Sequence, residues 1–210
     1  MGSDKWAQQL KEIESNSEFS FVFVGGPNEV ESHEKIFSML NSKTRHINIT
    51  GKTNGLLDLL NVIFRANAYV GKDCGTMHLA SACGIPVLSV FGGGHRDRFF
   101  PLNINSTAVT LDVPCRGCDW RCHLHEHVCV TGLPDGILSK LFLEKMSHPQ
   151  SILANKKLAP NKSIVDLCEK YKNPNYPENC HRIKKEKQKK LAKNLFLKKT
   201  RRLIQSFFEK

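Results

Sequence analysis

The sequence predicts an α/β protein with a doubly wound, Rossmann-like, mostly parallel sheet. Short apolar runs of strand length alternate with amphipathic segments of helix length, and glycine-rich turns follow two of the runs. A complete strand–turn–helix–strand unit stands at residues 68–91. Alternation of this kind is typical of βαβ units, in which a helix crosses back over the sheet between parallel strands.

The elements follow one another closely as far as residue 111. Helical spacing of apolar residues at 6–14 precedes a strand at 19–24, which ends in two glycines. We expect a helix at 29–40, a strand at 46–49 and a helix at 56–66. A strand at 68–71, a helix at 77–83 and a buried strand at 87–91 complete the central unit, and a last strand lies near 108–111.

Composition divides the chain into a core and a tail. We expect one domain over residues 1–146, with a cysteine-rich loop at 114–132 and a closing helix at 134–146. A shift to Pro, Asn and Lys predicts a linker at 147–181, followed by a basic amphipathic tail at 182–210. The tail contains 12 Lys and Arg against two Glu, so it carries nearly all of the net charge of +11.

The predicted location is cytoplasmic, because the chain has neither a signal sequence nor an apolar run of the roughly 20 residues that span a bilayer. Leu191, Leu195, Leu203 and Phe207 have helical spacing within the basic tail, which suits a helix on an anionic membrane surface, here the inner face. A solvated tail is the main alternative. No nucleic-acid motif is present, and we expect no nucleic-acid partner.

The turn in "VGKDCGTMHLA" combines residues that suit phosphate and sugar recognition. The backbone N–H groups of Gly75 and Thr76 open a helix and can bind an anion with help from the helix dipole. Asp73 can accept hydrogen bonds from sugar hydroxyls, and His78 can donate one to a phosphate oxygen. The alternative is structural, with Asp73 as a helix N-cap and His78 as an ordinary helix residue.

Four segments together resemble glycosyltransferase family 9, the lipopolysaccharide heptosyltransferases and their relatives. "DCGTMHLASACGIPVLSVFG" is similar to the family's D-[ST]-G-x-x-H-L-x-A-A-x-G-x-P-x-x-x-x-F-G segment. "FVFVGGPNEVE", "GKTNGLLDLLNVIFRANAYVG" and "FGGGHRDRFFPLN…VPCRGCDWRC" follow the family's order, and the last resembles a subgroup with clustered cysteines. The resemblance covers about residues 6–146.

The resemblance implies the GT-B arrangement of two facing Rossmann-like domains, of which this chain is the donor-binding half. The implied reaction transfers a sugar from a nucleotide diphosphate donor, ADP-heptose or another, to a hydroxyl of a glycolipid or glycan, without a catalytic cofactor. We expect the general base on an N-terminal acceptor domain, which a separate chain could supply, so no catalytic residue is assigned here. The alternatives are a non-catalytic nucleotide-sugar-binding module and a metal-binding interaction protein.

The resemblance also assigns donor-binding residues. Glu29 matches the residue on the donor's ribose, although an acid in the first turn of a helix is also stabilised by the dipole alone. Cys74 stands where the family has Ser or Thr. His95 and Arg98 belong to a basic loop that either neutralises the diphosphate or simply faces solvent. The expected donor site comprises Gly25, Gly26, Glu29, Asp73, Cys74, Gly75, Thr76, His78, His95 and Arg98.

Four clustered cysteines have the spacing C-x2-C-x3-C-x6-C. In a cytosolic protein, such clustering indicates a metal before it indicates disulfides, and tetrahedral thiolate sites suit zinc or iron. Reduced structural thiols or redox thiols are the alternative. Cys83, Cys168 and Cys180 are expected to be incidental. The predicted ligands of a structural metal are Cys115, Cys118, Cys122 and Cys129.

Overall fold

The computed structural model of the chain describes residues 1–94, 98–120, 122, 124–148 and 155–170. These residues lie in one unit, Met1–Tyr171, and the tail predicted at 182–210 lies outside the described residues. Among the helices of the described part, none is long and apolar enough to cross a membrane.

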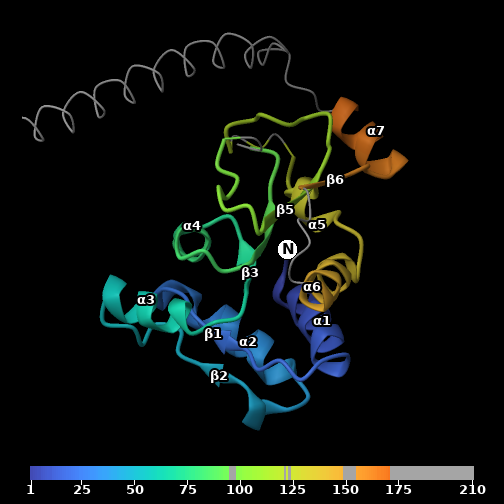
Figure 1. Cartoon of the computed structure of the whole chain (residues 1–210). Coiled ribbons are helices and arrows are strands. Elements are labelled where there is room, and N and C mark those ends of the chain that lie inside the picture. Colours follow the sequence, from blue (N-terminus) through green and yellow to red (C-terminus); the bar gives the residue numbers. More distant parts are fainter. Residues whose placement is uncertain (95–97, 121, 123, 149–154, 171–210) are drawn as a thin grey trace, which may run out of the picture. The chain divides into compact units, whose positions relative to one another are not determined.

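The strands are all parallel and form two sheets in the described part of the chain (Figure 1). A two-stranded sheet pairs β1 (Val22–Phe23) with β2 (Ile47–Asn48). The other sheet has its strands in sequence order, and its members are β3 (Tyr69–Lys72), β4 (Val87–Phe91), β5 (Ser106–Leu111) and β6 (Lys156–Leu158). Parallel neighbours require crossover connections, and helices lie in those from β1 to β2, from β3 to β4 and from β5 to β6.

Helices cover both faces of the four-stranded sheet. Leu88 and Val90 of β4 belong to the larger apolar cluster, which also contains residues of α1, α2 and α6. Val87 and Phe91 face the other way, into a smaller cluster with α3 and α4. This period-two division confirms the predicted doubly wound α/β fold. The helices are α1 (Ser3–Ser15), α2 (Val30–Met39), α3 (Leu56–Phe64), α4 (Gly75–Ala82), α5 (Val128–Thr131), α6 (Ile137–Ser147) and α7 (Lys162–Lys170), with short 3-10 turns η1 (Pro27–Glu29) and η2 (Lys43–Arg45).

A buried carboxylate on α1 holds the two-stranded sheet in place. Glu14 accepts hydrogen bonds from the backbone N–H groups of Asn41 at 3.0 Å and Ser42 at 2.6 Å, and from His46 Nε2 at 3.1 Å. The other ring nitrogen of His46 accepts the Phe21 N–H at 3.2 Å, so the imidazole is neutral. Burial alone would raise the pKa of Glu14, but the hydrogen bonds outweigh burial and lower it. One side chain thereby joins α1 to the segments that carry β1 and β2.

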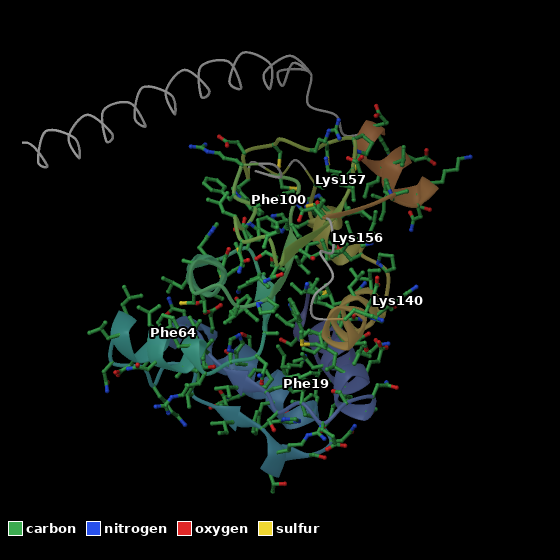
Figure 2. All side chains as sticks on the ribbon, in the orientation of Figure 1. Phe19, Phe64, Phe100, Lys140, Lys156 and Lys157 are labelled. Atoms are coloured by element: carbon green, nitrogen blue, oxygen red, sulfur yellow. The ribbon has the colours of Figure 1, made fainter. Side chains whose placement is uncertain are left out.

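The large cluster lies between the sheets and the helices that start and close the domain. α1 contacts both α2 and α6, and Figure 1 shows α1 and α6 beside each other. The Phe19 ring packs edge-on against Phe142 of α6, with their centroids 5.3 Å apart (Figure 2). The segment between α1 and β1 is therefore anchored to the closing helix.

The domain extends further along the chain than the sequence indicated. The predicted linker at 147–181 contains β6 and α7, and Ile164 and Cys168 of α7 are buried in the large cluster. β6 is an edge strand whose sequence, Lys156-Lys157-Leu158, gives no apolar run (Figure 2). Charged residues are common on edge strands because they discourage pairing with other chains. In β6, the two lysines leave no apolar pattern from which a strand could be predicted.

Candidate functional site

The predicted site residues collect at the carboxyl edge of the parallel strands. β1 runs into Gly25 and Gly26, and β3 runs directly into Asp73. Lys72 pairs with Val90 of β4, and the Asp73 N–H donates to the Val90 carbonyl at 3.0 Å. This ladder fixes the backbone from which α4 starts, at the edge where α/β proteins bind ligands.

The start of α4 is open to an incoming group. Cys74 is the N-cap residue with extended backbone, and Gly75 is the first helical residue. Apart from its two chain neighbours and the backbone of α4, no atom of the described residues lies within 4 Å of the point where a side chain at Gly75 would begin. His78 Nε2 lies 3.9 Å from Asp73 Oδ1, which is too long for a hydrogen bond, and the His78 side chain is 45% exposed. The helix start can therefore receive an anion, with both side chains beside it.

Cys74 makes a contact within the protein rather than pointing only to the open edge. Its sulfur lies 3.3 Å from the hydroxyl oxygen of Tyr69, and burial of Tyr69 raises the pKa of that phenol. The Tyr69 ring crosses directly over Gly71, where a Cβ would lie 2.7 Å from the ring carbon Cζ. Because Gly71 has no side chain, the Tyr69 ring can cross it and contact Cys74, in the turn that precedes α4.

Glu29 forms the second part of the edge, together with a lysine that the sequence analysis did not single out. The Glu29 carboxylate accepts the Gly26 N–H at 3.0 Å and forms an ion pair with Lys72 Nζ at 2.8 Å. The hydrogen bond from Lys72 lowers the pKa of Glu29. Nearby, His33 Nδ1 lies 2.8 Å from Thr50 Oγ1, and burial lowers the pKa of His33. The sequence feature that could have identified Lys72 is its position as a basic residue directly before Asp73, in "GKDCG".

The three glycines after β4 accommodate an indole ring. A Cβ on Gly92 would lie 3.0 Å from the Trp120 ring, and one on Gly94 would lie 2.9 Å from it. Asp119 and Trp120 both have positive φ, of 54° and 63°, which is uncommon for residues other than glycine. Trp120 remains 46% exposed. The glycines were predicted to bring a loop close to a ligand, and the structure shows that they bring this backbone close to Trp120.

The basic loop after these glycines is described only in part. Residues 95–97, including His95, lie outside the described residues. The Arg98 guanidinium lies over the ring of its neighbour Phe99, 4.9 Å from the ring centroid. The assignment of Arg98 to the donor diphosphate stays a prediction from the sequence.

The structure does not support the predicted zinc or iron site. The described residues include all four cysteines, yet they contain no group of three or more His, Cys, Asp or Glu residues placed to hold a metal ion. The metal assignment of Cys115, Cys118, Cys122 and Cys129 therefore gains no support from the described residues.

One of these cysteines has a partner that sequence spacing could not reveal. Cys115 Sγ lies 3.4 Å from Cys168 Sγ of α7, and Cys168 is 1% exposed. Cys168 had been expected to be incidental. Instead, it helps to seal the cysteine-rich loop against α7, next to the point where Ile164 packs on Gly132.

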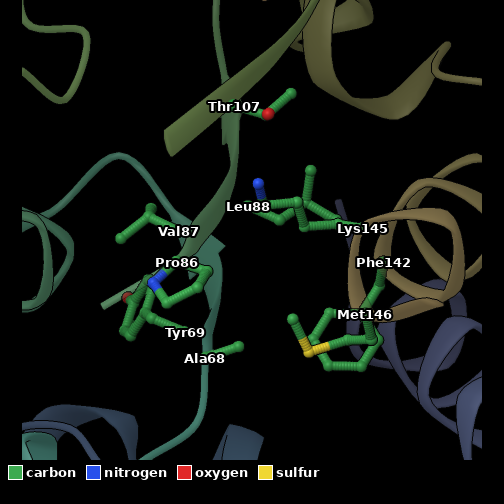
Figure 3. A pocket seen from close by; sticks show the side chains of 9 residues that line it. All are labelled: Ala68, Tyr69, Pro86, Val87, Leu88, Thr107, Phe142, Lys145 and Met146. Carbon is green, nitrogen blue, oxygen red and sulfur yellow. The ribbon is translucent and has the colours of Figure 1, made fainter. Parts of the chain in front are cut away.

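A cavity lies at the opposite, amino edge of the sheet (Figure 3). Its walls come from the residues before and at the starts of β3 and β4, from Thr107 of β5 and from α6. Lys145 of α6 is 5% exposed and lines this cavity. None of the predicted donor-binding residues that the structure describes lines it, so the cavity and the carboxyl edge are separate features of the fold.

Comparison with known proteins identifies the class. The sequence profile described as glycosyltransferase family 9 (heptosyltransferase) matches residues 3–128. This match covers more than half of the chain, and the chain therefore belongs to glycosyltransferase family 9. The profile spans β1 to β5 and with them all of the predicted donor-binding residues.

The chain is also similar to individual proteins. The chain is 27% identical over 139 residues to the lipooligosaccharide heptosyltransferase 2 of Campylobacter jejuni subsp. jejuni serotype O:6, covering 64% of this chain and 43% of that protein. Its fold is similar to that of the E. coli ADP-heptose LPS heptosyltransferase II, with a TM-score of 0.58, 18% identity, and coverage of 71% of this chain and 42% of the other. A family 9 glycosyl transferase from Veillonella parvula gives a TM-score of 0.46 at 22% identity, with coverage of 51% and 30%. The chain thus spans about two fifths of the first two relatives.

Proposed function

We propose that this chain binds the nucleotide diphosphate end of a sugar donor and provides the donor-binding part of a glycosyltransferase. The observation that carries the proposal is the carboxyl edge, where the open start of α4 and the Glu29 carboxylate flank Lys72. A family 9 profile over this same edge supports it. The proposed donor is ADP-heptose or a related nucleotide sugar, because the named relatives are heptosyltransferases.

In the proposed reaction, this part of the enzyme stabilises the leaving group. As the bond between the sugar and the diphosphate breaks, negative charge grows on the departing phosphate. The N–H groups of Gly75 and Thr76 and the ammonium of Lys72 are placed to meet such charge before it forms, which is where electrostatic catalysis is most effective. Asp73 would hold sugar hydroxyls, and Glu29 would hold ribose hydroxyls.

A binding experiment tests the donor site. We expect one of ADP, UDP or GDP, or the matching nucleotide sugar, to raise the melting temperature of the chain. At a ligand concentration a hundredfold above the dissociation constant, binding adds about 2.7 kcal/mol to the free energy of unfolding. Asp73→Asn should weaken nucleotide-sugar binding, while Asp135→Asn, at an exposed carboxylate that pairs with Lys5, serves as the matched control. No response to any of these ligands at millimolar concentration would overturn the proposal.

We further propose that turnover requires an acceptor-binding domain in addition to these 210 residues. A positioned base for the acceptor hydroxyl typically contributes on the order of 10²–10⁴-fold to the rate, and holding the acceptor in place contributes more. The 210-residue chain incubated with donor and a lipid-linked acceptor should then release no diphosphate. Robust turnover by the chain alone would contradict this and would require a base among its own residues.

The proposed location is an anionic membrane surface, where a glycolipid acceptor would be found. The supporting feature is the charge of the tail at 182–210, with 12 Lys and Arg against two Glu. Co-sedimentation with vesicles that contain phosphatidylglycerol should retain the full chain, and removal of residues 182–210 should abolish retention. Equal retention of the shortened chain would refute this location signal.

A further inference from the structure

Lys72 lies at the carboxyl edge, between the start of α4 and the start of α2. It is the last residue of β3, three residues before the first residue of α4. Its ammonium meets the carboxylate of Glu29, which ends η1 immediately before α2. The Lys72 side chain thus joins the two-stranded sheet's edge to the four-stranded sheet's edge.

The ion pair between Lys72 and Glu29 leaves N–H groups of the lysine available to a ligand. Its side chain is 60% exposed and that of Glu29 is 32% exposed, and exposed ion pairs hold their partners weakly. An ammonium has three N–H donors, so Lys72 can keep one hydrogen bond to Glu29 while it offers others. A diphosphate carries more negative charge than a carboxylate and would compete well for those donors.

Two titratable groups, Glu29 and His33, interact with the Lys72 ammonium. The Glu29 carboxylate stays ionised because the hydrogen bond from Lys72 lowers its pKa. His33, on the Glu29 side, has its pKa lowered first by burial and also by Lys72, so the imidazole is neutral and adds no competing cation. The nearby Thr50 hydroxyl is engaged by His33 at 2.8 Å. Lys72 therefore supplies the positive charge beside Glu29.

We propose that Lys72 binds a phosphate group of the donor, and that Glu29 holds the lysine in position until the donor arrives. This inference rests on the proposed donor-binding function and adds to it the residue that supplies positive charge. When the donor binds, the diphosphate accepts the remaining N–H groups of Lys72 and the ribose hydroxyls bind at Glu29, while the ion pair keeps one hydrogen bond. Lys72 is thus a binding residue for phosphate, distinct from the backbone anion site of α4.

The test compares a nucleoside diphosphate with the nucleoside that lacks its phosphates. Isothermal titration calorimetry would measure both ligands, with the base chosen as the best binder among ADP, UDP and GDP. Lys72→Met should weaken the nucleoside diphosphate by about 10- to 100-fold, because it removes a charge-assisted hydrogen bond. The same variant should change nucleoside affinity by less than about twofold, and Lys72→Arg should restore most of the diphosphate affinity.

Lys35 provides the matched control. It also forms an exposed ion pair between two elements, at 3.1 Å from Asp4 Oδ1, and its side chain is 56% exposed. Lys35→Met should leave both affinities unchanged. The wild-type affinity for the nucleoside diphosphate should also fall more steeply with added NaCl than that of Lys72→Met, because one ion contact is lost in the variant.

The outcomes separate this inference from the function beneath it. If the wild-type chain binds no nucleoside diphosphate, the donor-binding function itself fails. If it binds one and Lys72→Met binds equally well, only the Lys72 inference is overturned. Equal weakening of nucleoside and nucleoside diphosphate would also overturn it, because a purely structural role for the ion pair predicts that result.

Discussion

The carboxyl edge of the sheet and the cysteine-rich loop are held by contacts of different range along the chain. At the edge, the turns after β3 and β1 are shaped by local contacts, Tyr69 to Cys74 in the first and Gly26 to Glu29 in the second. At the cysteine-rich loop, Cys115 meets Cys168 across 53 residues. Short motifs specify local geometry, so they revealed the first region, whereas the second depends on where α7 docks.

The largest expected effect concerns Glu14, whose hydrogen bonds join α1 to the segments that carry β1 and β2. Glu14→Ala should lower the free energy of unfolding by about 3–5 kcal/mol, because it leaves the buried donors at Asn41, Ser42 and His46 without their acceptor. Urea denaturation measures this. Asp4→Ala, at an exposed carboxylate on the same helix, is the control and should change stability by less than about 1 kcal/mol. Equal, small losses would mean that the Glu14 network does not hold β1 and β2.

The same carboxylate predicts a pH dependence of stability. Because folding lowers the pKa of Glu14, its contribution is complete above the pKa of an unfolded Glu, about 4.3, and is lost as the pH falls through the lower folded value. The stability difference between wild type and Glu14→Gln should therefore shrink as the pH falls below about 4.3. A difference that stays constant down to the acid transition would contradict the lowered pKa.

A smaller loss should follow from disturbing the docking of α7. A Cβ at Gly132 would lie 2.7 Å from the Val128 carbonyl oxygen and would overlap Ile164. Gly132→Ala should cost about 1–3 kcal/mol, as overpacked cores do. Hydrogen exchange should increase in α5 and α7 while nucleoside diphosphate affinity stays within about twofold. A loss of affinity without a loss of stability would mean that the two regions are coupled.

Alanine substitutions at two glycines of the carboxyl edge should distinguish effects on the stability of the fold from effects on nucleoside diphosphate binding. Gly71→Ala pushes against the Tyr69 ring and should cost about 1–2 kcal/mol. At Gly75→Ala the added methyl group meets no atom of the described residues within 4 Å beyond the chain neighbours and the α4 backbone, so the free energy of unfolding should change by less than about 0.5 kcal/mol. It should still weaken the nucleoside diphosphate, because the added methyl group stands at the helix start. Thermal denaturation and calorimetry on the same samples check both expectations.

The smallest effect concerns thiol chemistry in the cysteine-rich loop. Burial raises the pKa values of Cys115, Cys118 and Cys129, so at pH 7 these thiols should react slowly with a disulfide reagent. Mass mapping after brief labelling should find these three and Cys168 less modified than in the urea-unfolded chain, and labelling should rise with pH. Rapid labelling of all four in the folded chain would contradict this packing.

Prediction from the sequence succeeded where patterns are short and failed where partners are distant. The order of elements from α1 to β5, the parallel pairing and the open start of α4 at Gly75 all follow local periodicity and turn chemistry. β6 was missed because Lys156-Lys157-Leu158 has no apolar run, and α7 because it lies in a polar segment whose buried residues are few. Lys72 was passed over because its role appears only once Glu29 lies 2.8 Å away. Trp120 was missed because its position over the glycines depends on two residues with positive φ.

The most direct test of the account is a crystal structure of the chain with ADP, or with the nucleoside diphosphate that binds best. The account predicts phosphate oxygens within hydrogen-bonding distance of the N–H groups of Gly75 and Thr76 and of Lys72 Nζ, with the ribose at Glu29. Phosphates in the cavity beside Lys145, at the opposite edge of the sheet (Figure 3), would contradict it.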